Sequence, residues 1–267
     1  MTQPKDTTLL SVSEGAAFAI DNPEGVSAVL LVCEHASKFI PGSLNNLELD
    51  NQTANSHVAW DPGAMVVAQH LSNILDATFI SARVSRLVYD CNRPPEAAGS
   101  MPAKSEIFLI KGNQNLSDEE KNARISEIYE PFTNAVKDEI AARIELGRDT
   151  VLITIHSFTP IYFGEKRVVE LGILHDQDSR LADAMLDITS TLETRRNLPY
   201  GPDDGVTHTL KLHALPNGLL NVMIEIRSDL IATEVSQKQV AAELSDMITS
   251  SINTLQNTLN EVETASA

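Results

Sequence analysis

Two histidines stand out because each follows a run of largely apolar residues. Val29–Cys33 leads into Glu34 and His35, and Val151–Ile155 leads into His156. Short apolar runs of this kind are typical of buried parallel strands. In open α/β sheets, ligands bind outside the carboxyl ends of the strands, so the two imidazoles are predicted to meet at one edge of a sheet. This pattern indicates a metal or catalytic site.

A third ligand is needed, because a catalytic zinc site uses three protein ligands and leaves one position for water. Asp61 and Glu34 are the candidates for a carboxylate ligand. Glu34 neighbours His35, so in an extended strand its side chain is expected to point to the opposite face. Asp61 precedes a predicted helix and can turn toward the strand ends. We therefore expect Asp61 to complete the set, the alternative being that it only caps its helix.

Glu225 follows the apolar run Val222–Ile224. Burying an unpaired carboxylate is costly, so this residue requires either a partner or a function. One interpretation is a structural ion pair with Arg227 or another arginine. The interpretation that we favour is a general base, which takes a proton from water whose pKa a bound metal lowers to roughly 7.

An anionic substrate would need cationic groups near this site. The candidates for substrate binding are Arg86, Asn92, Arg93 and Arg227. Guanidinium groups bind carboxylates bidentately, which fixes orientation as well as charge. The alternative for Arg86 is that it pairs with Asp90 and stabilises its own loop.

His208 and His213 flank a segment of alternating character, Thr209–Leu212. Either histidine could line the pocket and stabilise a developing oxyanion, and His213 is included among the candidate substrate-binding residues. A surface hairpin with incidental histidines explains the segment equally well.

Composition restricts the class of protein. The chain has 267 residues and a formal net charge of -17, which argues against nucleic acid or an anionic membrane surface as a partner. Its two cysteines exclude a disulfide framework and are expected to be reduced thiols. The first 21 residues lack the apolar core of a signal peptide, and no apolar run is long enough to cross a bilayer. These features predict a cytoplasmic protein and leave its oligomeric state open.

The elements that must position these residues alternate between strand and helix. Strands are expected at 29–33, 77–84, 150–156, 168–174 and 221–227, with an edge strand or packed arm at 16–20. Helices are expected at 62–76, 117–146, 179–196 and from 233 onward. This alternation predicts an α/β fold with a largely parallel sheet covered on both faces. One domain over 1–267 is expected, with an N-terminal arm at 1–25 and a frayed tail at 261–267.

Five ordered motifs span most of the chain, from Val29 to Leu230. They are Glu34–Ser37 with Ile40–Pro41, Asp61 with Gly63–Ala64, Ser85–Asp90 with Asn92–Pro94, His156–Phe158 with Pro160, and Ile224–Arg227 with Asp229–Leu230. Each motif is short, but the ordered set resembles the N-formylglutamate amidohydrolase family.

That family is related in fold to the zinc carboxypeptidases, so the resemblance implies a three-layer α/β/α sandwich around a mixed, mostly parallel sheet. It also implies that zinc-activated water attacks an amide or formamide, with His35 and His156 as metal ligands. By the same resemblance, Glu225 is the general base and Asn92–Arg93 holds a substrate carboxylate. The zinc carboxypeptidases have a glutamate ligand three residues after the first histidine, where this chain has Lys38. The carboxylate ligand must therefore come from elsewhere.

We accordingly expect a hydrolase that uses Zn²⁺ or another divalent metal and cleaves the N-acyl amide of a small acidic amino acid. N-formylglutamate is the expected substrate. One alternative is a peptidase or cell-wall amidase of the same fold. The other is a non-catalytic protein that binds a small molecule, which the loss of the expected glutamate at Lys38 keeps open.

Overall fold

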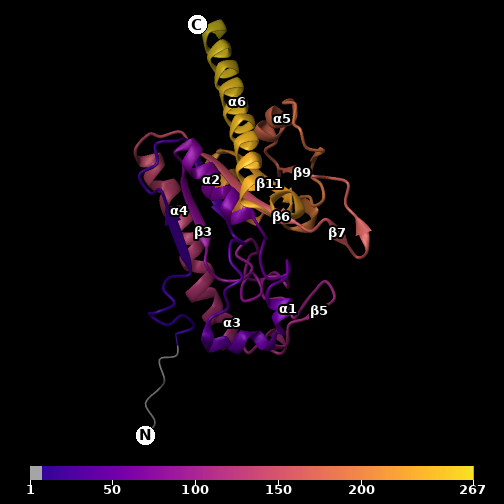
Figure 1. Cartoon of the computed structure of the whole chain (residues 1–267). Helices are drawn as coiled ribbons and strands as arrows, with labels where there is room; N and C mark the ends of the chain where they lie inside the picture. Colours follow the sequence, from indigo (N-terminus) through magenta and orange to yellow (C-terminus); the bar gives the residue numbers. More distant parts are fainter. Residues whose placement is uncertain (1–7, 267) are drawn as a thin grey trace.

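The strands that lead to the two histidines lie next to each other in a mixed β-sheet. In the computed structural model, which describes residues 8–266, this sheet has seven strands. Their order across the sheet is β1 (Phe18–Asp21), β3 (Thr78–Ala82), β2 (Val29–Cys33), β6 (Val151–Phe158), β11 (Leu220–Arg227), β9 (Leu171–Leu174) and β10 (Thr194–Arg196) (Figure 1).

The centre of the sheet is parallel and its edges are mixed. Strands β3, β2, β6 and β11 run parallel, β1 pairs antiparallel with β3, and β9 pairs antiparallel with β11. Every residue of β2 and β6 is buried, which explains why both read as apolar runs rather than as alternating patterns. The predicted mixed, mostly parallel α/β sheet is confirmed.

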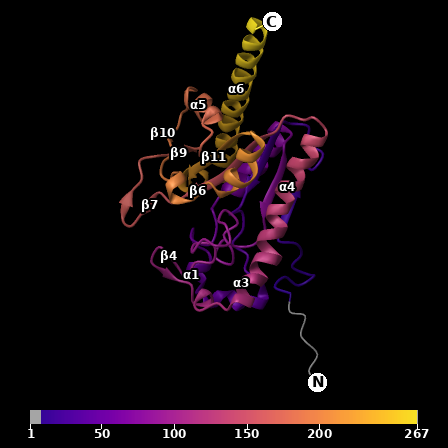
Figure 2. The same cartoon turned by 180° about the vertical axis from the view of Figure 1, so that it is seen from behind.

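Helices cover both faces of the sheet. On one face, α2 (Ala64–Leu75), α5 (Arg180–Leu186) and α6 (Glu234–Ser266) share a hydrophobic core with alternate strand residues such as Leu31. On the other face, α4 (Glu130–Glu145) packs with the intervening residues, such as Leu30 (Figure 2). Alternate side chains of β2 thus pack into two separate cores, as a three-layer arrangement requires.

The long helix predicted at 117–146 forms with an interruption. It begins as α3 (Asp118–Arg124), passes through a π-helical turn at Ile125–Tyr129 and continues as α4. Ser117 and Glu120 form both bonds of a capping box at its start, which satisfies two backbone N–H groups that would otherwise lack partners.

Two helix predictions need correction. The helix expected at 179–196 ends at Leu186, and Thr194–Arg196 instead forms β10, parallel to β9. The residues between them include Thr189, Ser190 and Thr191, which favour helix interiors poorly. Helix α2 begins at Ala64 rather than beside Asp61, after Gly63 in the left-handed region with φ +84°. A Cβ on Gly63 would lie 2.5 Å from the Ile231 carbonyl oxygen, so glycine is required there.

The two ends of the chain are more regular than expected. The segment expected at 16–20 forms the edge strand β1, while residues 1–7 of the predicted arm lie outside the described residues. Helix α6 continues to Ser266, through the segment expected to fray, and extends well beyond the sheet in Figures 1 and 2.

Small elements surround the carboxyl ends of the parallel strands. They are α1 (Asn51–Ala54), the hairpin of β4 (Lys104–Ser105) with β5 (Phe108–Leu109), and the hairpin of β7 (Ile161–Tyr162) with β8 (Glu165–Lys166). Helical turns occur at Gly42–Glu48, Lys111–Asn113, Pro202–Asp204, Leu210–Ala214, Leu215–Asn217 and Ser228–Ile231. Among the described helices, none combines the length and apolar character needed to cross a membrane.

Candidate metal centre and active site

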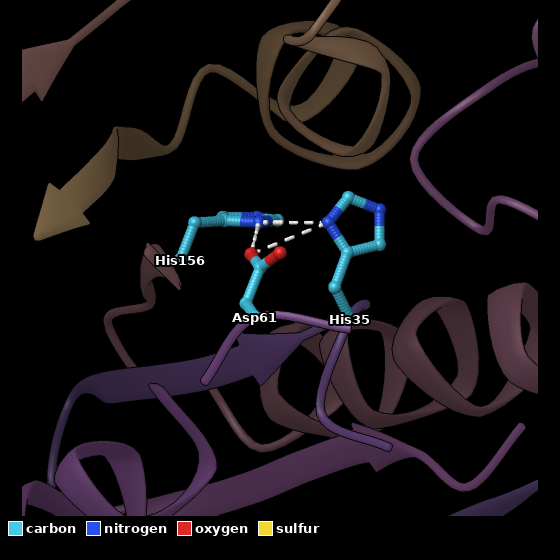
Figure 3. A group of neighbouring side chains, drawn as sticks. All are labelled: His35, Asp61 and His156. Carbon is cyan, nitrogen blue, oxygen red and sulfur yellow. Dashed lines mark hydrogen bonds and ion pairs between the residues drawn. The ribbon is translucent and has the colours of Figure 1, made fainter. Parts of the chain in front are cut away.

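His35, Asp61 and His156 point toward one another at the carboxyl ends of β2 and β6 (Figure 3). The Nδ1 atoms of the two histidines are 3.2 Å apart. Asp61 Oδ2 lies 3.0 Å from His156 Nδ1 and 3.4 Å from His35 Nδ1. All three residues are buried. The structure thus brings together the two imidazoles and the carboxylate that the sequence singled out.

Strand pairing and one backbone bond place these side chains. Strands β2 and β6 are parallel and paired from Val29 to Val32, so their carboxyl ends reach the same edge of the sheet. The Asp61 backbone N–H donates to the carbonyl of His35 at 2.9 Å, which brings the loop before α2 to that edge. The Asp61 side chain accepts from the Ser157 backbone N–H, so its orientation is fixed by β6.

A second layer of carboxylates holds the far nitrogen of each imidazole. His35 Nε2 lies 2.6 Å from Asp90 Oδ1, and His156 Nε2 lies 3.0 Å from Glu34 Oε2. The His156–Glu34 contact is an ion pair by distance and lacks the alignment of a hydrogen bond. Such partners orient a ligating imidazole and select its tautomer. With Nε2 engaged, both Nδ1 atoms are free to face a common point.

The position of Glu34 corrects the expectation that it points away from the site. Strand β2 ends at Cys33, so the alternation of a strand does not extend to Glu34 and His35. Glu34 therefore contacts His156 from behind, while Asp61 lies with the Nδ1 atoms.

The electrostatics of the centre favour a cation. Burial would raise the pKa of Asp61, but His35 and His156 outweigh it and hold that pKa well below its usual range. Burial lowers the pKa of His156, but Glu34 and Asp61 outweigh it and raise the pKa well above its usual value. The two shifts are reciprocal, because the imidazoles favour the ionised form of Asp61 and the carboxylates favour the protonated form of His156.

The excess of buried acid can be counted. Four buried carboxylates lie in or around the centre, those of Glu34, Asp61, Asp90 and Glu225. Among the described residues, two guanidinium groups contact them, those of Arg86 and Arg93. The raised pKa of His156 shows that these acids favour positive charge at the centre, and a divalent cation held by the same groups would supply it. Two imidazole nitrogens and one carboxylate oxygen also form a donor set that suits catalytic Zn²⁺.

Glu225 lies next to this centre, on the neighbouring strand β11. Strands β6 and β11 pair in parallel with Glu225 opposite His156. Its Oε2 atom is buried and has no hydrogen-bond partner among the described residues. Burial raises the pKa of Glu225 to about 7, and the charge of Asp61 acts in the same direction. The suggested ion pair with Arg227 does not form, because Arg227 donates to Asp229 and Glu170.

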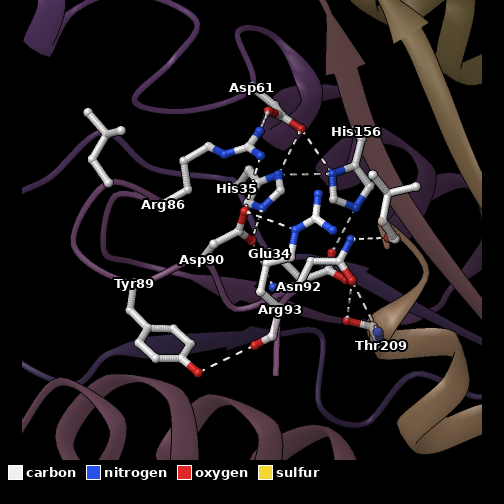
Figure 4. Close-up of polar contacts among 12 residues, drawn as sticks. Glu34, His35, Asp61, Arg86, Tyr89, Asp90, Asn92, Arg93, His156 and Thr209 are labelled. Carbon is white, nitrogen blue, oxygen red and sulfur yellow. Dashed lines mark hydrogen bonds and ion pairs between the residues drawn. The ribbon is translucent and has the colours of Figure 1, made fainter. Parts of the chain in front are cut away.

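His35, Asp61, Asp90 and Glu225 line a cavity of about 380 Å³, which is within the size range of small-molecule sites. Arg86 lines it and donates to Asp61 Oδ1 at 3.3 Å and to Asp90 Oδ2 at 3.1 Å (Figure 4). The pairing with Asp90 that the sequence left as an alternative is therefore present. Because Asp61 is a candidate metal ligand and Asp90 contacts His35, Arg86 stabilises the candidate ligand set.

Asn92 and Arg93 also line the cavity. The Asn92 side chain donates to the carbonyl of Val206 and accepts from the N–H of Thr209, so it joins two loops beneath the site. Arg93 Nη1 donates to the carbonyl of Asp204 at 2.7 Å. Both residues that the family resemblance assigns to substrate binding thus line the cavity.

Two predicted substrate-binding residues do not reach the cavity. Arg227 is occupied by Asp229 and Glu170, as described above, and is not among the lining residues. His213 is paired with Thr133 Oγ1 at 2.9 Å, and burial lowers its pKa to about 4. The surface hairpin considered as the alternative for this segment does not form, because Leu210–Ala214 is a π-helical turn, and His213 contacts Thr133 of α4.

The structure adds lining residues that sequence reasoning missed. They are His57, Lys104, Glu106, Tyr162 and Tyr200. Tyr200 lies in a loop marked by Gly and Pro, which is a usable signal for function. The others come from short hairpins or turns without hydrophobic periodicity, so no pattern marks them.

A buried His–Asp–His group beside a free carboxylate, set in a mixed α/β sheet, is typical of metal-dependent hydrolases. Comparison with known families agrees with this class. The family model for N-formylglutamate amidohydrolase (FGase) matches residues 27–232, and the chain belongs to this family. The family resemblance inferred from the ordered motifs is therefore confirmed.

Two solved structures are similar to the chain. The crystal structure of the gene product Atu2144 from Agrobacterium tumefaciens has 53% sequence identity and a TM-score of 0.92, covering 93% of this chain and 99% of that one. The N-formylglutamate amidohydrolase from Ralstonia eutropha JMP134 has 15% identity and a TM-score of 0.65, covering 91% of this chain and 99% of that one. The second likeness shows a shared fold. No curated protein matches the chain with significance.

Proposed function

We propose that the protein is a metal-dependent amidohydrolase that cleaves N-formylglutamate to formate and glutamate. The observation that supports this most is that His35 and Asp61, which group with the buried His156, line the same cavity as Glu225, whose Oε2 atom has no hydrogen-bond partner among the described residues. A metal site and a proton acceptor side by side are what hydrolysis of an unreactive amide requires.

His35, Asp61 and His156 would hold the metal through two Nδ1 atoms and one carboxylate oxygen. When bound, a divalent ion such as Zn²⁺ would polarise the formyl carbonyl and lower the pKa of water at the open position. Asp90 and Glu34 would keep the imidazoles oriented from behind, and Arg86 would hold Asp61 and Asp90 in place.

Glu225 is the proposed general base. It accepts a proton from water as the water oxygen bonds to the formyl carbon. It then returns that proton to the amide nitrogen as the C–N bond breaks, which releases formate and the amino acid. A carboxylate with a pKa near neutrality suits both halves of this transfer.

Arg93 is the proposed contact for a substrate carboxylate. One of its terminal nitrogens donates to Asp204, and the other has no hydrogen bond or ion pair among the described residues. Asn92 remains a predicted substrate contact beside it. A cytoplasmic location, a small anionic substrate and no nucleic-acid partner likewise remain predictions from composition and family.

Formate release tests this proposal. Purified protein is incubated with N-formylglutamate as isolated, after removal of metal by a chelator, and after reconstitution with Zn²⁺, Mn²⁺ or Co²⁺. Activity should disappear with the chelator and return with at least one metal. N-acetylglutamate in parallel tests the preference for formyl. If no metal supports formate release, N-formylglutamate is not the substrate.

A further inference from the structure

Lys104 differs from the other cations of the cavity because nothing holds its charged group. Three cations line the cavity in the described part of the chain, namely Arg86, Arg93 and Lys104. Arg86 is bound to Asp61 and Asp90, and Arg93 contacts the Asp204 carbonyl. The Lys104 ammonium has no hydrogen bond or ion pair with any described residue, and its side chain is exposed. It is the cation that remains free for a ligand.

The hairpin that carries Lys104 is fixed at the cavity rim. Lys104 pairs with Leu109 across β4 and β5, and the Ile110 N–H donates to the Ala103 carbonyl at 3.0 Å. Ile110 is fully buried in the core, which anchors the base of the hairpin. At its tip, Glu106 Oε1 accepts from His57 Nε2 at 2.8 Å, next to α1. The backbone of Lys104 is therefore held in place before any ligand binds.

A second hairpin also contributes to the lining of the cavity. Tyr162 of β7 and Lys104 of β4 line the same space, and Figure 1 shows the two hairpins on the side of the molecule where the parallel strands end. A ligand bound at the metal centre would extend between them. The groups on these hairpins would then contact the part of the ligand that lies farthest from the reacting bond.

An acidic N-formyl amino acid carries two carboxylates at different distances from the scissile amide. The α-carboxylate is attached to the carbon next to the amide nitrogen, while the side-chain carboxylate extends farther away. Arg93 lies 4.0 Å from Asp90, which itself contacts His35, so Arg93 is close to the metal centre. Lys104 lines the same cavity but is exposed, whereas His35 and Asp61 are buried. We infer that Lys104 binds the side-chain carboxylate and selects acidic N-formyl amino acids over neutral ones, an inference that rests on the proposed function.

The test compares N-formylglutamate with N-formylglutamine, which have the same shape and differ in one charge. We expect Lys104→Met to lower kcat/KM for N-formylglutamate by about tenfold or more, mainly through KM, because a charge-assisted contact is lost. The value for N-formylglutamine should stay within about threefold of wild type, and Lys104→Arg should keep the preference for the charged substrate. Lys111→Met, a change just beyond the same hairpin and off the cavity, is the matched control.

Binding measurements separate this inference from the proposed function. The affinity of wild type and Lys104→Met for both compounds is measured by calorimetry, whether or not either compound is hydrolysed. If wild type releases no formate yet binds N-formylglutamate more tightly, and Lys104→Met removes that preference, the inference holds and the proposed reaction fails. If the affinities of wild type for N-formylglutamate and N-formylglutamine differ by less than about threefold, Lys104 does not bind the side-chain carboxylate. The same conclusion follows if Lys104→Met keeps the preference for N-formylglutamate.

Discussion

Asp90 is the residue on which the metal centre should depend most without touching the metal. The residue is 4% exposed, and its side chain contacts three parts of the site. It lies 2.6 Å from His35 Nε2, accepts from Arg86 Nη2 at 3.1 Å and accepts from the Asn92 backbone N–H at 3.0 Å. Asp90→Asn keeps the volume and one acceptor oxygen but removes the charge. The change therefore isolates the electrostatic contribution of this carboxylate.

The expected loss follows from these contacts. Carboxylates that support a metal-bound histidine contribute about 10–100-fold to metal affinity, which corresponds to about 1.4–2.7 kcal/mol. The short, buried His35–Asp90 contact argues for the upper half of this range. The same change leaves Arg86 with Asp61 as its acidic partner. Arg86 would then compete more strongly with the metal for the Asp61 carboxylate. Both effects act in the same direction.

The assay is competition for Zn²⁺ against a chromophoric chelator, with thermal unfolding of the metal-free protein measured alongside. Asp183→Asn is the matched control, because Asp183 also pairs with an arginine, Arg196, but on the surface. It should leave Zn²⁺ affinity unchanged. A folded Asp90→Asn protein that binds Zn²⁺ within about threefold of wild type would show that the carboxylate behind His35 does not tune the centre.

Two other changes test separate parts of the molecule. Glu225→Gln should lower kcat by about 10²–10⁴-fold while Zn²⁺ affinity stays unchanged, and a variant that keeps a tenth of wild-type kcat rules out Glu225 as the base. Glu243 on α6 accepts from Ser190 and from the Thr191 N–H, and these bonds lower its pKa although partial burial opposes them. A lowered carboxyl pKa stabilises the fold above the unfolded pKa of about 4.3 and loses that effect below it. Glu243→Gln should therefore lower the free energy of unfolding, measured with urea, by about 1 kcal/mol at pH 7 and by less as the pH falls toward 4. A difference between variant and wild type that does not change with pH would contradict this role of Glu243.

The strands could be predicted from sequence because their physics is local. A strand covered on both faces must be apolar at every position, and β2 and β6 are. The convergence of His35 and His156 followed from one further rule, that parallel strands present their carboxyl ends at one edge. These two steps predicted that residues 121 positions apart meet at one edge of the sheet, and in the structure their Nδ1 atoms are 3.2 Å apart.

The carboxylates that contact the far nitrogens of the two imidazoles could not be predicted from these rules. Asp90 was recognised as a partner for Arg86, but nothing in the sequence shows that its other oxygen reaches His35, 55 residues earlier. Glu34 was misplaced because its neighbour Cys33 is the last strand residue, and one residue at a strand end decides which way a side chain points. Lys104 carries no local signal at all, because two-residue strands have no period to detect.

The register of β11 against β6 links the fold most directly to the proposed chemistry. Eight consecutive pairs run from Leu220–Val151 to Arg227–Phe158, and they set Glu225 opposite His156. Because side chains alternate with a period of two, a slip of one residue would turn Glu225 to the other face of the sheet. The apolar neighbours Ile224 and Ile226 are fully buried in the core beneath α6, so such a slip would also place apolar side chains in the cavity and a carboxylate in the core. The packing of Ile224 and Ile226 that stabilises the sheet thus also keeps Glu225, the proposed base, on the face of the candidate metal centre.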